Sequence, residues 1–255
     1  MNVVIRISGS MMALLLLLAV QVGASEKGDQ ERAKLHVQLA SEYYERGHYG
    51  VALEEVNIAL QAKPDYALAY SVRGLIHVAF KEDDEAEQNL RKALDIDPND
   101  GDANHNYGWF LCVRRQNYAE SLPYFLAALK SPLYLSAGKS FLQAGLCSYK
   151  LGELMRAEEY FESAYRVLPN SPEILLTLSD FYYKRSQWEK AKLYMAKHDR
   201  LRLPTARSLW LALRIERQLG NRGVESALEH ELNSRFPDTY QTQLLRSGKY
   251  DVDSE

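Results

Sequence analysis

The stretch ALAYSVRGLIHVAFKEDDEAEQNLRKALDIDP, residues 67–98, decides the fold of this 255-residue chain. It holds two runs of helical apolar spacing, separated by the polar segment 81–85 and ended by Pro98. A small residue, Gly74, stands inside the first run, and another, Ala86, stands near the start of the second. Because small side chains let two helix backbones approach closely, the stretch predicts two helices joined by a turn and packed together.

The same pattern returns along the chain with a period near 34 residues. Six of the eight prolines mark it, at spacings of 34, 34, 37, 35 and 33 residues: Pro64, Pro98, Pro132, Pro169, Pro204 and Pro237. This period is typical of the tetratricopeptide repeat, a helix pair that must stack on its neighbours to bury its apolar face. We predict an all-α fold, a right-handed superhelical solenoid of six tetratricopeptide repeats over residues 33–237.

The register of the repeats explains most of the small and bulky residues. Position 8 of the first helix is small in five repeats: Ala40, Gly74, Gly108, Gly145 and Ser179. So is the residue that opens the second helix: Ala52, Ala86, Ser121, Ala157 and Ala191. Bulkier residues follow one turn later: Val56, Leu90, Phe125, Phe161 and Met195. We expect left-handed caps at Gly47, Gly152 and Gly220, a degenerate sixth repeat, and a C-terminal cap and tail over residues 238–255.

The N-terminus indicates export. Arg6 precedes the unbroken apolar run Met11–Val20, and the small residues Gly23 and Ala24 follow it. This pattern is typical of a secretory signal peptide over residues 1–24, and the run is too short for the alternative, a membrane-spanning anchor. We therefore expect cleavage after Ala24, a linker over residues 25–32, and a periplasmic protein.

The two cysteines favour a disulfide. Cys112 and Cys147 lie near equivalent positions of the first helices of repeats three and four, which stack side by side in such arrays. In an oxidising compartment neighbouring thiols become a disulfide. The alternative is a pair of buried, unpaired thiols.

No catalytic or cofactor motif stands out. The six histidines lack metal-binding spacing, and the sequence has neither a Cys-x-x-Cys motif nor a phosphate-binding glycine loop. His105 and Cys112 on one helix are about 10 Å apart along the axis, too far for a nucleophile and its base. We predict no enzyme activity, no cofactor, no metal and no small-molecule substrate.

Charge is distributed unevenly. Residues 26–102 carry 17 acids and 9 bases, whereas residues 184–222 carry 3 acids and 11 bases, among them Arg207, Arg214 and Arg217 at expected groove positions. An exported protein rarely meets nucleic acid, so we expect none as a partner. The basic region fits either solvated helix faces or contact with an acidic protein or anionic envelope surface.

The groove of the predicted solenoid is the candidate binding site for a protein partner. Positions 2, 5, 9, 12 and 13 of each first helix should face it. The residues expected to form a largely apolar strip there are Leu68, Ser71, Leu75, Val78, Trp109, Leu142, Leu146 and Tyr149. An exposed apolar strip would take an amphipathic helix or an extended peptide, with Trp109 as an anchor. Alternatively, tight curvature hides these residues between neighbouring helices.

Two segments add a family resemblance. The residues Asn106–Cys112 (NYGWFLC) and Ala144–Cys147 (AGLC), the second following Ser131–Tyr134 (SPLY), resemble the PilF/PilW family of type IV pilus biogenesis proteins. The resemblance implies a six-repeat superhelix with an apolar groove, and a pilotin role in localising, assembling or stabilising the outer-membrane secretin. Cys112 and Cys147 match the cysteines that some members bridge.

One departure from the family concerns the membrane. Many members are lipidated on a cysteine at the cleavage site, where this chain has Ser25. The expectation is therefore a periplasmic scaffold without a lipid anchor, which binds the secretin or another pilus component. The alternative function is an exported adaptor for enzymes of peptidoglycan or of the envelope.

Overall fold

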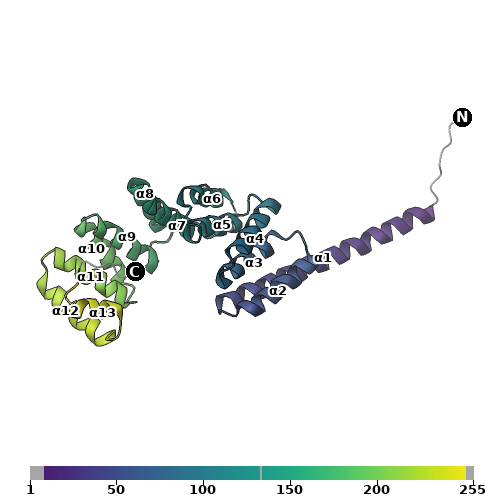
Figure 1. Cartoon of the computed structure of the whole chain (residues 1–255). Helices are drawn as coiled ribbons and strands as arrows, with labels where there is room; N and C mark the ends of the chain where they lie inside the picture. The colour runs from purple at the N-terminus through teal and green to yellow at the C-terminus, as the bar shows by residue number, and fades with distance from the viewer. Residues whose placement is uncertain (1–8, 133, 251–255) are drawn as a thin grey trace. The chain divides into compact units, whose positions relative to one another are not determined.

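The computed structural model describes residues 9–132 and 134–250, with side chains from residue 27 onward (Figure 1). All regular structure in this part is helical, with thirteen α-helices and no strand, which confirms the predicted fold class. The chain divides into two compact units, residues 1–135 and 136–255, and each is described by itself.

Both units consist of antiparallel helix pairs. The first unit contains α1 (Gly9–Glu45), α2 (Tyr49–Ala62), α3 (Ala67–Phe80), α4 (Asp83–Ile96), α5 (Gly101–Val113) and α6 (Tyr118–Lys130). The second contains α7 (Ala137–Lys150), α8 (Leu154–Val167), α9 (Pro172–Lys184), α10 (Trp188–Asp199), α11 (Ala206–Gln218), α12 (Arg222–Arg235) and α13 (Tyr240–Arg246). Each odd-numbered helix from α1 to α11 packs on the next helix, so the described part of the chain holds six pairs and a short last helix.

The small residues at position 8 lie where the two helices of a pair touch, as the register predicts. A Cβ atom on Gly74 would lie 2.6 Å from Leu90 Cγ, and one on Gly145 would lie 2.6 Å from Phe161 Cδ1. In the fifth pair, Ser179 Oγ donates a hydrogen bond of 2.9 Å to the carbonyl oxygen of Ala191. In these pairs, the backbone of one helix therefore lies in direct contact with residues of the other. Burying each bulky residue contributes roughly 1.5–3 kcal/mol.

The turn between the two helices of a pair has one recurring conformation. Gly47, Gly152 and Gly220 have φ of 78°, 81° and 74°, which confirms the predicted left-handed caps. Lys81 and Ser186 take the same conformation, with φ of 64° and 56°. The turn geometry is therefore a property of the repeat, and glycine is its unstrained occupant.

The N-terminal helix is longer than the repeat requires. The predicted linker, residues 25–32, is instead helical and continuous with α1. Lys63 Nζ donates a hydrogen bond of 2.5 Å to Gln30 Oε1, so this extra turn packs on the end of α2. Of the predicted signal peptide, residues 1–8 lie outside the described residues, and residues 9–24 form the start of α1.

The last helix continues the repeat beyond the sixth pair. α13 begins at Tyr240, 34 residues after the start of α11 at Ala206, and it packs on both α11 and α12. It therefore occupies the place of the first helix of a seventh repeat. It closes a terminal core formed by Leu209, Trp210 and Leu213 of α11, Leu232 of α12, and its own Leu244 and Leu245. Tyr250 covers this core, its ring stacked 5.8 Å from that of Trp210. Residues 251–255 of the predicted tail lie outside the described residues.

Candidate partner-binding site

Three of the eight predicted groove residues are buried in the helix packing. Ser71 has no exposed surface, Val78 is 9% exposed and Leu142 is 3% exposed. Ser71 Oγ accepts a hydrogen bond of 2.9 Å from Asn106 Nδ2, which ties α3 to α5. These positions hold neighbouring repeats together, so they offer a partner little surface.

The other five predicted residues are half-buried. In the first unit, Leu68 packs on the core of the first two repeats, and Trp109 packs on the core around Leu90 and Phe110. In the second unit, Leu146 and Tyr149 pack on the core around Phe181. Leu75 of α3 is also half-buried. Leu142, Leu146 and Tyr149 belong to the second unit, and Leu75 and Trp109 belong to the first.

The hydrogen bond between Asn106 and Ser71 sets the register of α3 against α5. Residues three or four apart share a helix face, so Leu75 lies one turn beyond Ser71 and Trp109 one turn beyond Asn106. Since α3 and α5 are in contact, Leu75 and Trp109 are neighbours on one face. A further turn brings Ala79 beside Val113 by the same argument.

Val113 is the site residue that the sequence-based strip left out. Its side chain is 47% exposed, more than any of the eight predicted residues, whereas Ala79 is half-buried. The sequence could have identified Val113 as a site residue, because it stands at position 13 of a first helix and that position faces the groove in this repeat. We call Leu75, Ala79, Trp109 and Val113 the α3–α5 patch.

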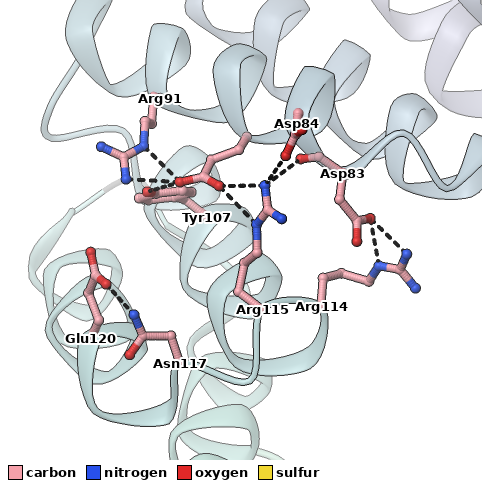
Figure 2. Close-up of polar contacts among 9 residues, drawn as sticks. Asp83, Asp84, Arg91, Tyr107, Arg114, Arg115, Asn117 and Glu120 are labelled. Carbon is pink, nitrogen blue, oxygen red and sulfur yellow. Dashed lines mark hydrogen bonds and ion pairs between the residues drawn. The ribbon is translucent and has the colours of Figure 1, made fainter.

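Charged residues lie at the other edge of the same repeats, where α5 ends beside the start of α4 (Figure 2). Arg114 makes two hydrogen bonds to Asp83 Oδ1, of 2.7 and 3.0 Å. Arg115 pairs with Asp84 at 2.6 Å and with Glu87 at 2.9 Å. Arg91 also pairs with Glu87, at 2.9 Å. Three acids thus face three arginines, so the network fastens α5 to α4 without leaving a net charge for a partner.

Burial and neighbouring charges change the pKa of Tyr107, which belongs to this network. Its hydroxyl donates to Glu87 Oε1 over 3.4 Å, and the Arg91 guanidinium lies 5.5 Å from its ring centre. Burial raises the pKa of the Tyr107 hydroxyl, the Arg91 cation opposes that rise, and the Glu87 carboxylate adds to it. The hydroxyl therefore stays protonated at neutral pH and serves as a hydrogen-bond donor.

Both cysteines are disulfide-bonded, as predicted from compartment and register. Cys112 is therefore no thiol nucleophile for His105, whose ring instead packs on those of Phe125 and Tyr134. Within the described residues, no group of three or more His, Cys, Asp or Glu side chains could hold a metal ion. In the same part of the chain, no helix has the length and apolarity needed to cross a membrane.

The basic residues expected in the groove of the sixth repeat are largely used within the fold. Arg214 is buried, with its guanidinium 4.6 Å from the centre of the Tyr183 ring. Arg217 pairs with Glu225 at 2.6 Å and covers the ring of Tyr250. The expectation that Arg214 faces a groove is wrong, because its side chain lies within the helix packing.

Comparison with known proteins identifies relatives of this chain. The tetratricopeptide repeat family model matches residues 37–101 and 113–172. Type IV pilus assembly protein PilF of Pseudomonas aeruginosa is 27% identical over 225 residues, which cover 88% of this chain and 89% of PilF. A solved structure of PilF from Pseudomonas aeruginosa superposes with a TM-score of 0.77 at 27% identity, covering 87% of this chain and all of that one (100%).

A second solved structure is more similar in sequence. The crystal structure of PilW, a widely conserved type IV pilus biogenesis factor, is 32% identical to this chain with a TM-score of 0.78. The match covers 84% of this chain and 98% of PilW. The chain therefore belongs to the PilF/PilW family of tetratricopeptide-repeat proteins of type IV pilus biogenesis.

Proposed function

We propose that this chain is a type IV pilus biogenesis and stability factor, a non-enzymatic scaffold of the periplasm. Its α3–α5 patch binds a segment of the outer-membrane secretin, or of another pilus component, and promotes assembly or stability of that component. Two observations support the proposal: membership of a pilus biogenesis family, and a half-exposed aromatic residue with apolar neighbours on the first-helix face.

The patch suits an apolar peptide segment. Trp109 rests on the core around Leu90, so its ring is held in place before a partner arrives. Val113 and Leu75 extend the apolar surface on the same face. A rigid aromatic at the centre of such a surface is a common hot spot, where truncation costs roughly 2 kcal/mol or more of binding free energy. An amphipathic helix or an extended peptide could cover the patch.

The central test replaces the patch and leaves the core intact. The double variant Leu75→Glu with Trp109→Ala should abolish surface pili and secretin multimers, because a buried carboxylate and a missing anchor oppose binding. The matched control is Leu35→Glu with Phe80→Ala, which also introduces one glutamate and removes one aromatic ring, at positions 55% and 40% exposed. Electron microscopy and gel analysis of secretin multimers are the readouts, with circular dichroism to compare helical content. Normal piliation in the patch variant would refute the proposal.

Identification of the bound protein separates the two candidate functions. Capture from envelope extract with the wild-type chain should recover the secretin or another pilus component, and the patch variant should lose it. Recovery of a peptidoglycan or other envelope enzyme, with no pilus protein, would favour the adaptor alternative.

The location is a separate part of the proposal. We propose that residues 1–24 are removed during export and that the protein acts without a lipid anchor, since Ser25 replaces the cysteine that lipidation requires. Mass analysis of the protein from a periplasmic fraction should give an N-terminus at Ser25. A chain that starts at Met1 in the cytoplasmic fraction would contradict export.

A further inference from the structure

The loop between α10 and α11 differs in charge from the loops between successive repeats of the first unit. In the first unit these loops are residues 63–66 (KPDY) and 97–100 (DPND), which together carry three acids and one base. In the second unit, the loop between α10 and α11 and the first turn after it read RLRLPTAR, residues 200–207, with three bases and no acid. The α10–α11 loop thus has a charge opposite to that of the first-unit loops, whereas the other two loops of the second unit, residues 168–171 (LPNS) and 236–239 (FPDT), carry no base.

The basic loop also exposes an apolar side chain. Leu203 is 58% exposed. Three arginines near it in the sequence are also exposed: Arg200, Arg202 and Arg207. Leu201 points the other way and packs on the core of the unit. Arg202 has φ of 54°, a left-handed bend between the buried and the exposed leucine. The loop is therefore anchored by one leucine and presents the other to solvent.

Two neighbouring loops extend this edge. Helices α9, α11 and α13 contact one another in succession, and each follows a loop at the same place in the repeat. The loop before α9 contributes Leu168, 42% exposed, and α13 starts with Tyr240, 50% exposed. Arg166 and Arg235 lie in the last turns of the helices that lead into these loops.

The loop arginines are not neutralised by the fold. Other bases of this region have partners: Arg185 pairs with Glu158, Lys192 with Glu216, and Arg217 with Glu225. Of the ion pairs among the described residues, none involves Arg200, Arg202 or Arg207. Their charge is available to an external anion.

We propose that this basic edge, formed by Arg200, Arg202, Leu203, Arg207 and Tyr240, binds the surface of an anionic lipid bilayer. Leu203 in the loop before α11 and Tyr240 at the start of α13 can enter the headgroup region, while the arginines face lipid phosphates. A fluid interface accepts such projecting side chains without a matching pocket, which favours a bilayer over an acidic protein. Each arginine near an anionic surface strengthens partitioning roughly fivefold. The proposal does not depend on the α3–α5 patch.

Vesicle sedimentation tests this surface. The purified protein, with its N-terminus determined by mass analysis, is mixed with vesicles of phosphatidylethanolamine and phosphatidylglycerol, or of phosphatidylcholine alone, at low and high salt. Wild-type protein should bind the anionic vesicles more strongly, and Arg200→Glu with Arg202→Glu should weaken that binding at least about tenfold. Leu203→Ser should weaken it severalfold, including at high salt where the charges are screened.

A control variant changes the net charge by the same amount, but in the first unit. Arg32→Glu with Lys92→Glu alters two exposed bases of the first unit and should change binding by about twofold or less, within the range of screened surface charges. An equal loss in both double variants would overturn the proposal, because net charge alone would then explain binding. So would equal binding of the wild type to both kinds of vesicle, or binding to polyglutamate without binding to anionic vesicles. If Arg200→Glu with Arg202→Glu lowers the melting temperature, Arg200→Gln with Arg202→Gln replaces it and should also weaken vesicle binding.

Discussion

At the residue scale, the closeness of the two helices in a pair depends on a single missing methyl group. Gly74 and Gly145 sit against Leu90 and Phe161 so tightly that a Cβ would overlap them. The repeat tolerates alanine or serine at the same position, as at Ala40 and Ser179, where Val56 or Met195 is the facing bulky residue. Position 8 is therefore glycine where Leu90 or Phe161 packs against it, and alanine or serine in the pairs that hold Val56 or Met195.

We predict that Gly74→Ala lowers the free energy of unfolding by roughly 1–3 kcal/mol, because the new Cβ would lie 2.6 Å from Leu90 Cγ in a packed core. Chemical denaturation followed by circular dichroism measures the change. Gly50→Ala is the matched control: Gly50 is also helical, but no heavy atom lies within 4 Å of the added methyl group. That variant should gain up to about 1 kcal/mol, since glycine loses more backbone entropy on folding. Equal effects in the two variants would show that the contact with Leu90 is unimportant.

A second residue-scale prediction concerns the turn at Lys81, whose φ is 64°. Lys81→Gly should raise the free energy of unfolding by roughly 0.5–1 kcal/mol, because the left-handed region strains residues that carry a Cβ. Gly152→Ala, at the equivalent turn of the second unit, should lower it by about 1 kcal/mol or more. Thermal melts of both variants test the pair, and a stabilising Gly152→Ala would contradict the explanation.

At the scale of elements, half-buried acids join neighbouring helices through tyrosine hydroxyls. Glu162 of α8 accepts hydrogen bonds from Tyr182 of α9 at 2.9 Å and from Tyr194 of α10 at 2.6 Å. Tyr182 also donates to Glu158 at 3.0 Å. In the first unit, Glu87 plays a similar part with Tyr107 and Arg115 (Figure 2). These carboxylates connect one repeat to the next. The periodic pattern of apolar residues alone does not specify these connections.

The same tyrosines predict how stability depends on pH. Burial raises the pKa of Tyr182 and of Tyr194, and the hydrogen bonds to Glu162 raise both further. A tyrosine whose pKa is higher in the folded state than in the unfolded state contributes to stability. The contribution is present in full below the unfolded-state pKa, near pH 10, and is lost as the pH rises above that value. The free energy of unfolding should therefore fall with rising pH above about pH 10.

Denaturant unfolding between about pH 8 and pH 11 tests this dependence. The double variant Tyr182→Phe with Tyr194→Phe should be less stable at neutral pH, because Glu162 loses two donors, and its stability should fall less steeply at alkaline pH. Identical alkaline slopes for the variant and the wild type would contradict the assignment to these two hydroxyls.

At the scale of the whole molecule, the disulfide constrains the unfolded chain. Cys112 and Cys147 are 35 residues apart in the sequence. Closing a loop of this length stabilises the native state by about 3–4 kcal/mol in the chain-entropy model. The stabilisation depends on an oxidising compartment, which links the fold to the predicted export.

Cys112→Ser with Cys147→Ser should therefore lower the melting temperature by several degrees, and reduced wild-type protein should melt near the same temperature. Differential scanning calorimetry with and without a thiol reductant measures both. The prediction fails if mass analysis of the exported protein finds two free thiols, or if reduction leaves the melting temperature unchanged.

The sequence alone determined the fold class, because a 34-residue period, small residues at position 8 and glycine turns are local patterns that only a stacked helix pair satisfies together. It also identified position 8 as a place where the two helices of a repeat touch, whereas the contact of Gly74 with Leu90 came from the structure. It could not decide which groove positions stay accessible, since burial at Ser71, Val78 and Leu142 depends on how closely the next repeat packs. Only the tertiary structure showed that Val113 is exposed and that Arg214 is buried, because solvent exposure is set by neighbours distant in the sequence.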